Sequence, residues 1–167
     1  MTIVKIVLLV STAFTVGCQS ARLSPSINQL SPTTRAAVAD TIQHMTTDLI
    51  RAVDRVNPNE IFAFFSNSAD FAAAGMGTLY TSLDPFRSFY TGIYATLQSD
   101  EIRLSESKII VLSPAAAIIT ASGTFSNVDK AGKVSPRIPL SLTLLWVRER
   151  AGWKILHIHE SFGQPLQ

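Results

Sequence analysis

One carboxylate near the C-terminus is the side chain best suited to chemistry, because its neighbours along the chain are apolar. Glu160 lies between Ile158 and Phe162 in a run that alternates apolar and polar residues. Such alternation is typical of a β-strand and would place these three side chains on one face. A carboxylate there must be hydrated, paired or protonated, and desolvation raises its pKa into the range of a general acid or base. Glu160 is therefore the first candidate for catalysis or ligand binding, and an ion pair with Arg137 or Arg148 is the competing interpretation.

The opposite face of the same strand carries two imidazoles. His157 and His159 are two residues apart, and the alternation groups them with Trp153 and Ile155. Two histidines so spaced could reach one metal ion, but a zinc site needs three or four ligands, and His44 belongs to a distant helix. We therefore expect no metal and no other cofactor. We assign Trp153, His157 and His159 to a dimer interface on the outer surface of the sheet.

Composition excludes several other classes of function. The chain has 167 residues, a net charge of +2 and only 16% charged residues. It contains no cluster of lysine and arginine that could follow a phosphate backbone, so we expect no nucleic-acid partner. No G-x-S-x-G nucleophile elbow occurs, so the sequence does not support serine-hydrolase chemistry of that kind. The length fits one domain of ordinary size.

The N-terminal segment predicts an exported, lipid-anchored protein. Lys5 precedes an apolar run at residues 6–10, and residues 15–18 read Thr-Val-Gly-Cys, which resembles a bacterial lipobox. We expect residues 1–17 to be a lipoprotein signal peptide and Cys18 to carry lipid after cleavage. A plain secretory signal is the alternative, and the apolar run is too short for a membrane span of about 20 residues.

The residues that follow predict a location and a tether. Gln19 stands where an Asp would be typical of inner-membrane retention, so we expect anchoring in the outer membrane, on the periplasmic side. Residues 18–33 are polar and contain prolines without apolar periodicity, which is typical of a tether. We expect residues 34–167 to form one domain without disulfides, because lipid occupies the only cysteine.

Helices dominate the first part of the domain. A long helix is predicted from Thr34, because apolar residues recur every three or four positions. These residues are Val38, Ile42, Met45, Leu49, Val53 and Val56. Asn-Pro at 57–58 predicts the start of a short helix through Phe65, and Asp-Pro at 84–85 predicts a third helix. The aromatic face of the third helix includes Tyr90, whose hydroxyl could serve a pocket.

Strands dominate the rest of the chain. Short extended pieces are predicted at 70–74 and 78–81, around a turn that contains glycines. Four longer strand-like runs follow, at 102–112, 116–128, 138–147 and 153–162. Short turns separate the longer runs, so three successive hairpins are the simplest connection. The predicted fold class is α+β, with a curved antiparallel sheet wrapped around the N-terminal helices.

The C-terminal residues resemble a known superfamily. Trp146, the charged turn at 148–152, Trp153 and the run His-Ile-His-Glu-Ser at 157–161 are similar to the end of nuclear transport factor 2-like proteins. The likeness is strongest to the SnoaL-like branch and to the association domain of calcium/calmodulin-dependent protein kinase II. In element order it covers residues 34–165. It implies a cone-like fold with a pocket between sheet and helices, and dimers formed through the outer sheet surface.

The resemblance also implies which residues line the pocket. Two pocket arginines of the kinase association domain match Glu160 and Leu144, so both basic groups are missing here and a carboxylate ligand is disfavoured. Asp70 and Tyr80 come from the segment that lines the mouth in similar proteins, although Asp70 also suits a turn or cap. The expected ligand-binding residues are Glu160, Trp146, Leu144, Ile158, Phe162, Tyr80, Tyr90 and Asp70.

Together these observations favour a binding protein over an enzyme. We expect a dimeric, lipid-anchored periplasmic protein whose pocket binds a small, largely apolar molecule. This scaffold hosts many functions, so two alternatives stay open. One is an isomerase, dehydratase or hydrolase in which Glu160 or Asp70 is the base and Tyr80 donates a hydrogen bond. The other is an envelope interaction module that assembles through the sheet surface bearing the two histidines.

Overall fold

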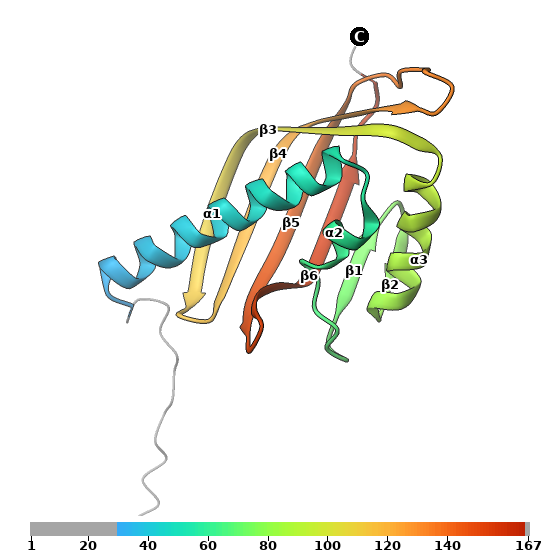
Figure 1. The fold of residues 1–167 in the computed structure, drawn as a ribbon. Helices are drawn as coiled ribbons and strands as arrows, with labels where there is room; N and C mark the ends of the chain where they lie inside the picture. The colour runs from blue at the N-terminus through green and yellow to red at the C-terminus, as the bar shows by residue number, and fades with distance from the viewer. Residues whose placement is uncertain (1–29, 166–167) are drawn as a thin grey trace, which may run out of the picture.

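A strongly curved sheet and three helices make up the part of the chain that the computed structural model describes, residues 30–165 (Figure 1). The long helix α1 crosses in front of β3, β4 and β5, and α3 lies at the far side beside β1 and β2. The elements are α1 (Pro32–Asp54), α2 (Pro58–Phe62), β1 (Ala72–Gly75), β2 (Thr78–Tyr80), α3 (Leu83–Tyr94), β3 (Leu97–Ser113), β4 (Ala116–Asp129), β5 (Ile138–Glu149) and β6 (Gly152–Phe162). This is the predicted α+β fold. Among these residues, no helix combines the length and apolar character needed to cross a membrane.

Helix α1 begins two residues before the predicted start. Ser31 is its N-cap, and the side chain accepts a hydrogen bond of 3.1 Å from the Thr34 backbone N–H. Pro32 suits the first helical position, because its missing N–H would have no partner there. The tether prediction is therefore wrong for residues 32–33. The predicted signal peptide, Cys18 and the rest of the tether up to residue 29 lie outside the described residues.

The two shorter helices differ from prediction at their ends. Asn57 caps α2 as expected, but the helix ends at Phe62 because Phe65 already pairs with the sheet. Helix α3 begins at Leu83 rather than after Asp84. Proline is tolerated so near the start because the first four N–H groups of a helix have no intrahelical acceptor.

The sheet has the strand order β2-β1-β6-β5-β4-β3. Strands β3 to β6 follow one another and pair antiparallel, as predicted. Strand β1 instead pairs with β6 in parallel, which the sequence analysis did not predict. Strands β1 and β2 form a hairpin whose turn residues, Met76 and Gly77, both have positive φ, at 50° and 77°.

Glycine permits a sharp bend of the sheet where β3 and β4 pair. The register of β3 against β4 shifts between Leu104 and Glu106, and Gly123 lies opposite Leu104. A Cβ atom on Gly123 would stand 2.1 Å from the carbonyl oxygen of Arg103, so no other residue fits without movement. Figure 1 shows β3 crossing the top of the molecule and then bending down beside β4. The bulge and bend curl the sheet around the helices and leave room for a cavity.

A β-bulge in β6 changes which residues face the core. Ile155 pairs with Trp146 and His157 pairs with Leu145, so Leu156 between them has no partner on β5. An extra residue in one strand reverses the alternation of side chains beyond it. Ile155 and its partner Trp146 are accordingly both fully buried.

This bulge corrects one predicted grouping. Trp153 and Ile155 were expected to share the outer face with His157 and His159, but Ile155 is buried and Trp153 packs against the core. Trp153 is therefore removed from the outer surface that we assigned to dimer contacts. Beyond the bulge the predicted alternation is right, and Glu160 pairs with Leu142 on the side that faces the helices.

Candidate functional site

Two adjoining cavities lie between the helices and the concave side of the sheet. The narrow cavity has a volume of about 40 Å³ and the wide cavity about 730 Å³. They share Val53, Tyr90, Tyr94, Ile102 and Glu160. The wide cavity is also lined by Met76, Gly77, Ile93, Asp100, Phe125, Asn127, Ile138, Leu140, His159, Ser161 and Phe162.

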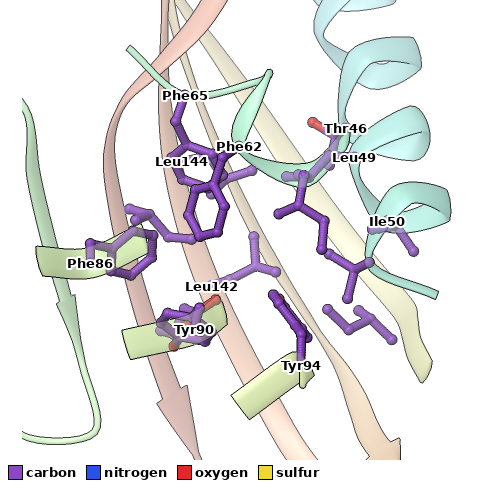
Figure 2. Close-up of a pocket in the computed structure, with 15 residues that line it drawn as sticks. Thr46, Leu49, Ile50, Phe62, Phe65, Phe86, Tyr90, Tyr94, Leu142 and Leu144 are labelled. Atoms are coloured by element: carbon purple, nitrogen blue, oxygen red, sulfur yellow. Dashed lines mark hydrogen bonds between the residues drawn. The ribbon is translucent and has the colours of Figure 1, made fainter. Parts of the chain in front are cut away.

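The narrow cavity is a small void left among closely packed side chains. Figure 2 shows side chains converging on it from the helices and from β5, with Leu49 on α1, Phe86 on α3 and Leu144 on β5. Phe62 and Phe65 close it from the α2 side, with ring centroids 5.4 Å apart. Ligand pockets usually measure about 300–1,000 Å³. The narrow cavity is therefore an imperfectly filled part of the core, and the wide cavity is the candidate site.

A carboxylate and a phenol meet where the two cavities join. Tyr90 on α3 donates a hydrogen bond from its hydroxyl to Oε2 of Glu160 on β6. Gly75 on β1 leaves space beside them, because a Cβ there would stand 3.5 Å from Oε2 and 3.7 Å from the Tyr90 hydroxyl. Arg137, which could have paired with Glu160, is bound to Glu101 at 2.5 Å. Glu160 is thus a cavity carboxylate, and the competing interpretation of an ion pair with Arg137 does not hold.

Burial changes the acidity of this pair. Desolvation raises the pKa of Glu160 above its usual range, although the Tyr90 hydrogen bond and nearby His159 oppose the rise. Desolvation and the adjacent Glu160 raise the pKa of Tyr90, so its hydroxyl keeps its proton and acts as a donor. The structure therefore supplies the perturbed carboxylate that the strand pattern predicted.

A second carboxylate, Asp100, was missed by the sequence analysis. It lies near the start of β3, is only 5% exposed and lines the wide cavity. Burial, together with the negative charges of Asp54 and Glu160, raises its pKa to about 7. The Glu101 backbone N–H donates a 2.9 Å hydrogen bond to Oδ1, which opposes the rise. The predicted strand began at Ile102; extending its alternation back by two residues would have placed Asp100 on the inner face.

A second tyrosine adds a polar group to the wall of both cavities. Tyr94 lies one helical turn after Tyr90, and the two ring centroids are 6.1 Å apart. It is 8% exposed, and burial raises the pKa of its phenol. Tyr94 was not among the expected ligand-binding residues. Its spacing from Tyr90 was the available signal.

Most of the expected ligand-binding residues line a cavity, and three do not. Glu160 and Tyr90 line both cavities, Leu144 and Ile158 the narrow one, and Phe162 the wide one. The remaining three, Trp146, Tyr80 and Asp70, line neither.

Each of these three residues has another environment. Trp146 is fully buried in the core against Phe64. Tyr80 packs against α3, with its ring centroid 5.5 Å from that of Phe86. Asp70 is exposed in a turn where its backbone N–H bonds to the Ser68 hydroxyl. The turn interpretation of Asp70 therefore replaces the catalytic one.

The two histidines of β6 differ in their surroundings. His159 is exposed and His157 is partly buried, and their cross-strand partners on β5 are Thr143 and Leu145. Within residues 30–165 no group of three or more His, Cys, Asp and Glu side chains is placed to hold a metal ion.

The arrangement suits two kinds of chemistry. Asp100 has its pKa close to neutrality, so it can gain or lose a proton at little cost. Glu160 can accept a proton in an apolar wall while Tyr90 donates a hydrogen bond to it. The same groups can instead anchor the polar end of an otherwise apolar ligand.

The fold resembles solved structures from several organisms. An NTF2-like superfamily protein from Salmonella enterica has a TM-score of 0.68 and 18% identity, covering 79% of this chain and 95% of that one. A ketosteroid isomerase-like protein from Erwinia carotovora atroseptica has a TM-score of 0.62 and 17% identity, covering 75% and 96%. The association domain of C. elegans CaMKII has a TM-score of 0.61 and 13% identity, covering 77% and 98%. At these identities the likeness shows the fold alone.

The family is shown by the sequence itself. No curated protein matches the chain. The model of the SnoaL-like domain matches residues 42–165, which include α3, the long strands and both cavity carboxylates. The chain therefore belongs to the SnoaL-like domain family, within the NTF2-like fold.

Proposed function

We propose that this protein binds a small, largely apolar molecule in the wide cavity. The observation that carries the proposal is the cavity itself, whose volume of about 730 Å³ lies within the usual range for ligand sites. Aliphatic and aromatic side chains such as Ile93, Phe125 and Phe162 form most of its wall. Glu160 and Asp100 supply the few polar groups that would orient a ligand.

A neutral apolar fluorophore tests this proposal. N-phenyl-1-naphthylamine should bind the purified protein with a saturable rise in fluorescence. Ile138→Trp adds bulk to the wall of the wide cavity and should weaken binding by about tenfold or more. Val134→Trp is the matched control, because Val134 is 65% exposed in the loop between β4 and β5 and should leave binding unchanged. Equal binding by both variants, or no saturable binding by the wild-type protein, would reject the proposal.

A second candidate function is proton transfer on a bound carbonyl compound, as in an isomerase or a dehydratase. The specific observation that favours it is a pair of cavity carboxylates whose pKa values are both raised. The Erwinia protein of the same fold is described as ketosteroid isomerase-like. Glu160 would remove a proton from the carbon next to the carbonyl, and Tyr94 or protonated Asp100 would donate a hydrogen bond to the carbonyl oxygen.

Deuterium exchange separates this reaction from simple binding. Ketones with acidic α-hydrogens are incubated with the protein in D₂O, and incorporation of deuterium is followed by NMR. Glu160→Gln should abolish enzyme-dependent exchange while changing the melting temperature little, because the amide oxygen can still accept the Tyr90 hydrogen bond. Glu106→Gln, at an exposed position of β3, should exchange at the wild-type rate. A fully active Glu160→Gln variant would eliminate this mechanism.

We also propose that the protein is anchored by lipid on Cys18 in the bacterial envelope, on the periplasmic side of the outer membrane. The N-terminal sequence supports this proposal, which concerns residues outside the described structure. Cys18→Ser should lose incorporation of a labelled fatty acid in a bacterial host and should move the protein out of the membrane fraction. Retention of label by the variant would contradict it.

A homodimer through the outer sheet surface is the last part of the proposal. In support of it, His157 and His159 alternate along β6 with Ile158 and Glu160, which face the helices, although His159 also borders the wide cavity. The double variant His157→Ala, His159→Ala should shift the mass measured by light scattering from dimer to monomer. A wild-type monomer, or an unchanged dimer in the double variant, would argue against this interface.

A further inference from the structure

The wide cavity has an acidic wall. Asp100 and Glu160 both line it, whereas lysine and arginine are absent from its described lining, and His159 is the only basic side chain there. Two neighbouring carboxylates of β3 lie on opposite sides of the strand. Asp100 faces the cavity, while its neighbour Glu101 faces away and pairs with Arg103 and Arg137, each at 2.5 Å.

Both carboxylates keep an oxygen for a ligand. Glu160 receives the Tyr90 hydroxyl on Oε2, and Asp100 receives the Glu101 backbone N–H on Oδ1. Within residues 30–165, neither Oε1 of Glu160 nor Oδ2 of Asp100 receives a hydrogen bond. A carboxylate in an apolar wall gains most from a donor that also carries positive charge.

Aromatic rings stand beside these carboxylates. Tyr90 and Tyr94 line the same cavity from α3, with ring centroids 6.1 Å apart. The face of an aromatic ring attracts cations, and a partly desolvated site strengthens this attraction. An anionic ligand would meet two negative charges here with no cationic Lys or Arg in the described wall to compensate.

We infer that the ligand of the wide cavity is a small organic amine, with a charged ammonium group held by Asp100 and Glu160 and an apolar body held by the aromatic wall. This inference rests on the proposed binding function and names the class of molecule that the site takes. The ammonium supplies three N–H donors, which fit the open carboxylate oxygens. The apolar body occupies the part of the cavity beside Phe125 and Phe162.

Three probes with one apolar body test the inference. They are 3-phenylpropylamine, 3-phenylpropan-1-ol and 3-phenylpropanoate, which carry positive, zero and negative charge near neutral pH. Isothermal titration of the full protein should show the amine binding at least about tenfold more tightly than the alcohol, with the carboxylate weakest. The double variant Asp100→Asn, Glu160→Gln should bind amine and alcohol equally. Glu101→Gln, which removes one negative charge on the outer side of β3, should keep the preference.

The outcomes distinguish the inference from the proposed function. If the alcohol binds as tightly as the amine, or the amine does not bind, the inference is wrong. Saturable binding of N-phenyl-1-naphthylamine in that case would leave the proposed binding function in place. If the fluorophore also fails to bind, both are wrong. A preference for the amine that survives in the double variant would likewise overturn the assignment to these two carboxylates.

Discussion

The two cavities adjoin in one fold, yet the side chains that line them differ in burial and in polarity. Around the narrow cavity, side chains such as Leu144 and Ile158 are at least 95% buried and mostly apolar. Around the wide cavity, Phe125 and Phe162 are partly exposed and share the wall with Asp100 and Glu160. The inner face of β6 contributes to both. The comparison teaches that one strand face can build core at one end and a binding site at the other.

The two ends differ most in the free energy that a buried charge costs, because only the wide end contains Asp100. The pKa of Asp100 rises from 3.8 in the unfolded chain to about 7 in the fold, so the folded protein binds its proton more tightly. Stability from this group is complete below pH 3.8 and is lost as the pH rises through about 7. Asp100→Asn should remove this slope and stabilise the protein at pH 8 by up to about 4 kcal/mol, since each pKa unit corresponds to about 1.4 kcal/mol.

Urea unfolding between pH 4 and 8 measures this effect, with Glu101→Gln as the matched control. Arg137 and Arg103 lower the pKa of Glu101, which is the opposite shift, so its removal should leave the slope between pH 5 and 7 in place. An Asp100→Asn variant with the same fall in stability as the wild type would show that Asp100 is well hydrated. Glu160 would then be the remaining carboxylate of the wide cavity whose pKa is raised by burial.

The largest effect at the narrow end should come from lost packing. Leu144 is 1% exposed and lies between Ile119 and Ile158 on neighbouring strands. Leu144→Ala should lower the free energy of unfolding by about 3 kcal/mol, because it removes buried carbon atoms and enlarges an existing void. Urea unfolding measures the loss, and the N-phenyl-1-naphthylamine titration should be little changed below the transition. A loss under about 1 kcal/mol would mean that the narrow end relaxes to fill the space.

The corresponding change at the wide end should affect ligand more than stability. Phe162 is partly exposed and packs edge-to-face with Phe125, with ring centroids 5.4 Å apart. Phe162→Ala should cost only about 1 kcal/mol of stability, because the ring is not enclosed. It should weaken binding of N-phenyl-1-naphthylamine several-fold. If Phe162→Ala costs as much stability as Leu144→Ala, the proposed difference between the two ends does not hold.

Regular strand segments and the bulge of β6 also differ in how well the sequence predicts them. Strand alternation placed Leu144, Ile158 and Glu160 correctly, because the buried face of a regular strand repeats every second residue. It failed at Trp153 and Ile155, because the extra residue Leu156 reverses the alternation and leaves no mark in composition.

The polar residues of the site were harder to predict than the fold. Element order and the antiparallel pairing of the long strands follow from periodicity and turns, and both were predicted. Asp100 was missed because β3 begins five residues before the predicted strand. Asp70 was chosen from a resemblance, but the chain turns there before β1 begins and the side chain lies in solvent. A long-range pair such as Tyr90 and Glu160 depends on how α3 packs on the sheet, which local patterns do not specify.

The smallest expected effect concerns the rim of the wide cavity. Met76 is 64% exposed and has a φ of 50°. This left-handed conformation is uncommon for residues other than glycine, asparagine and aspartate. Met76→Asn should stabilise the protein by about 0.5 kcal/mol, because Asn-Gly is the preferred pair for such a turn. If the methionine is retained for its apolar contact with ligand, the same change should weaken N-phenyl-1-naphthylamine binding. Leu79→Asn, 67% exposed on the next strand and outside the cavity wall, should leave binding unchanged. Equal affinities for Met76→Asn and wild type would remove the turn from the site and confine the wide end to Val53 of α1, to α3 and to the long strands.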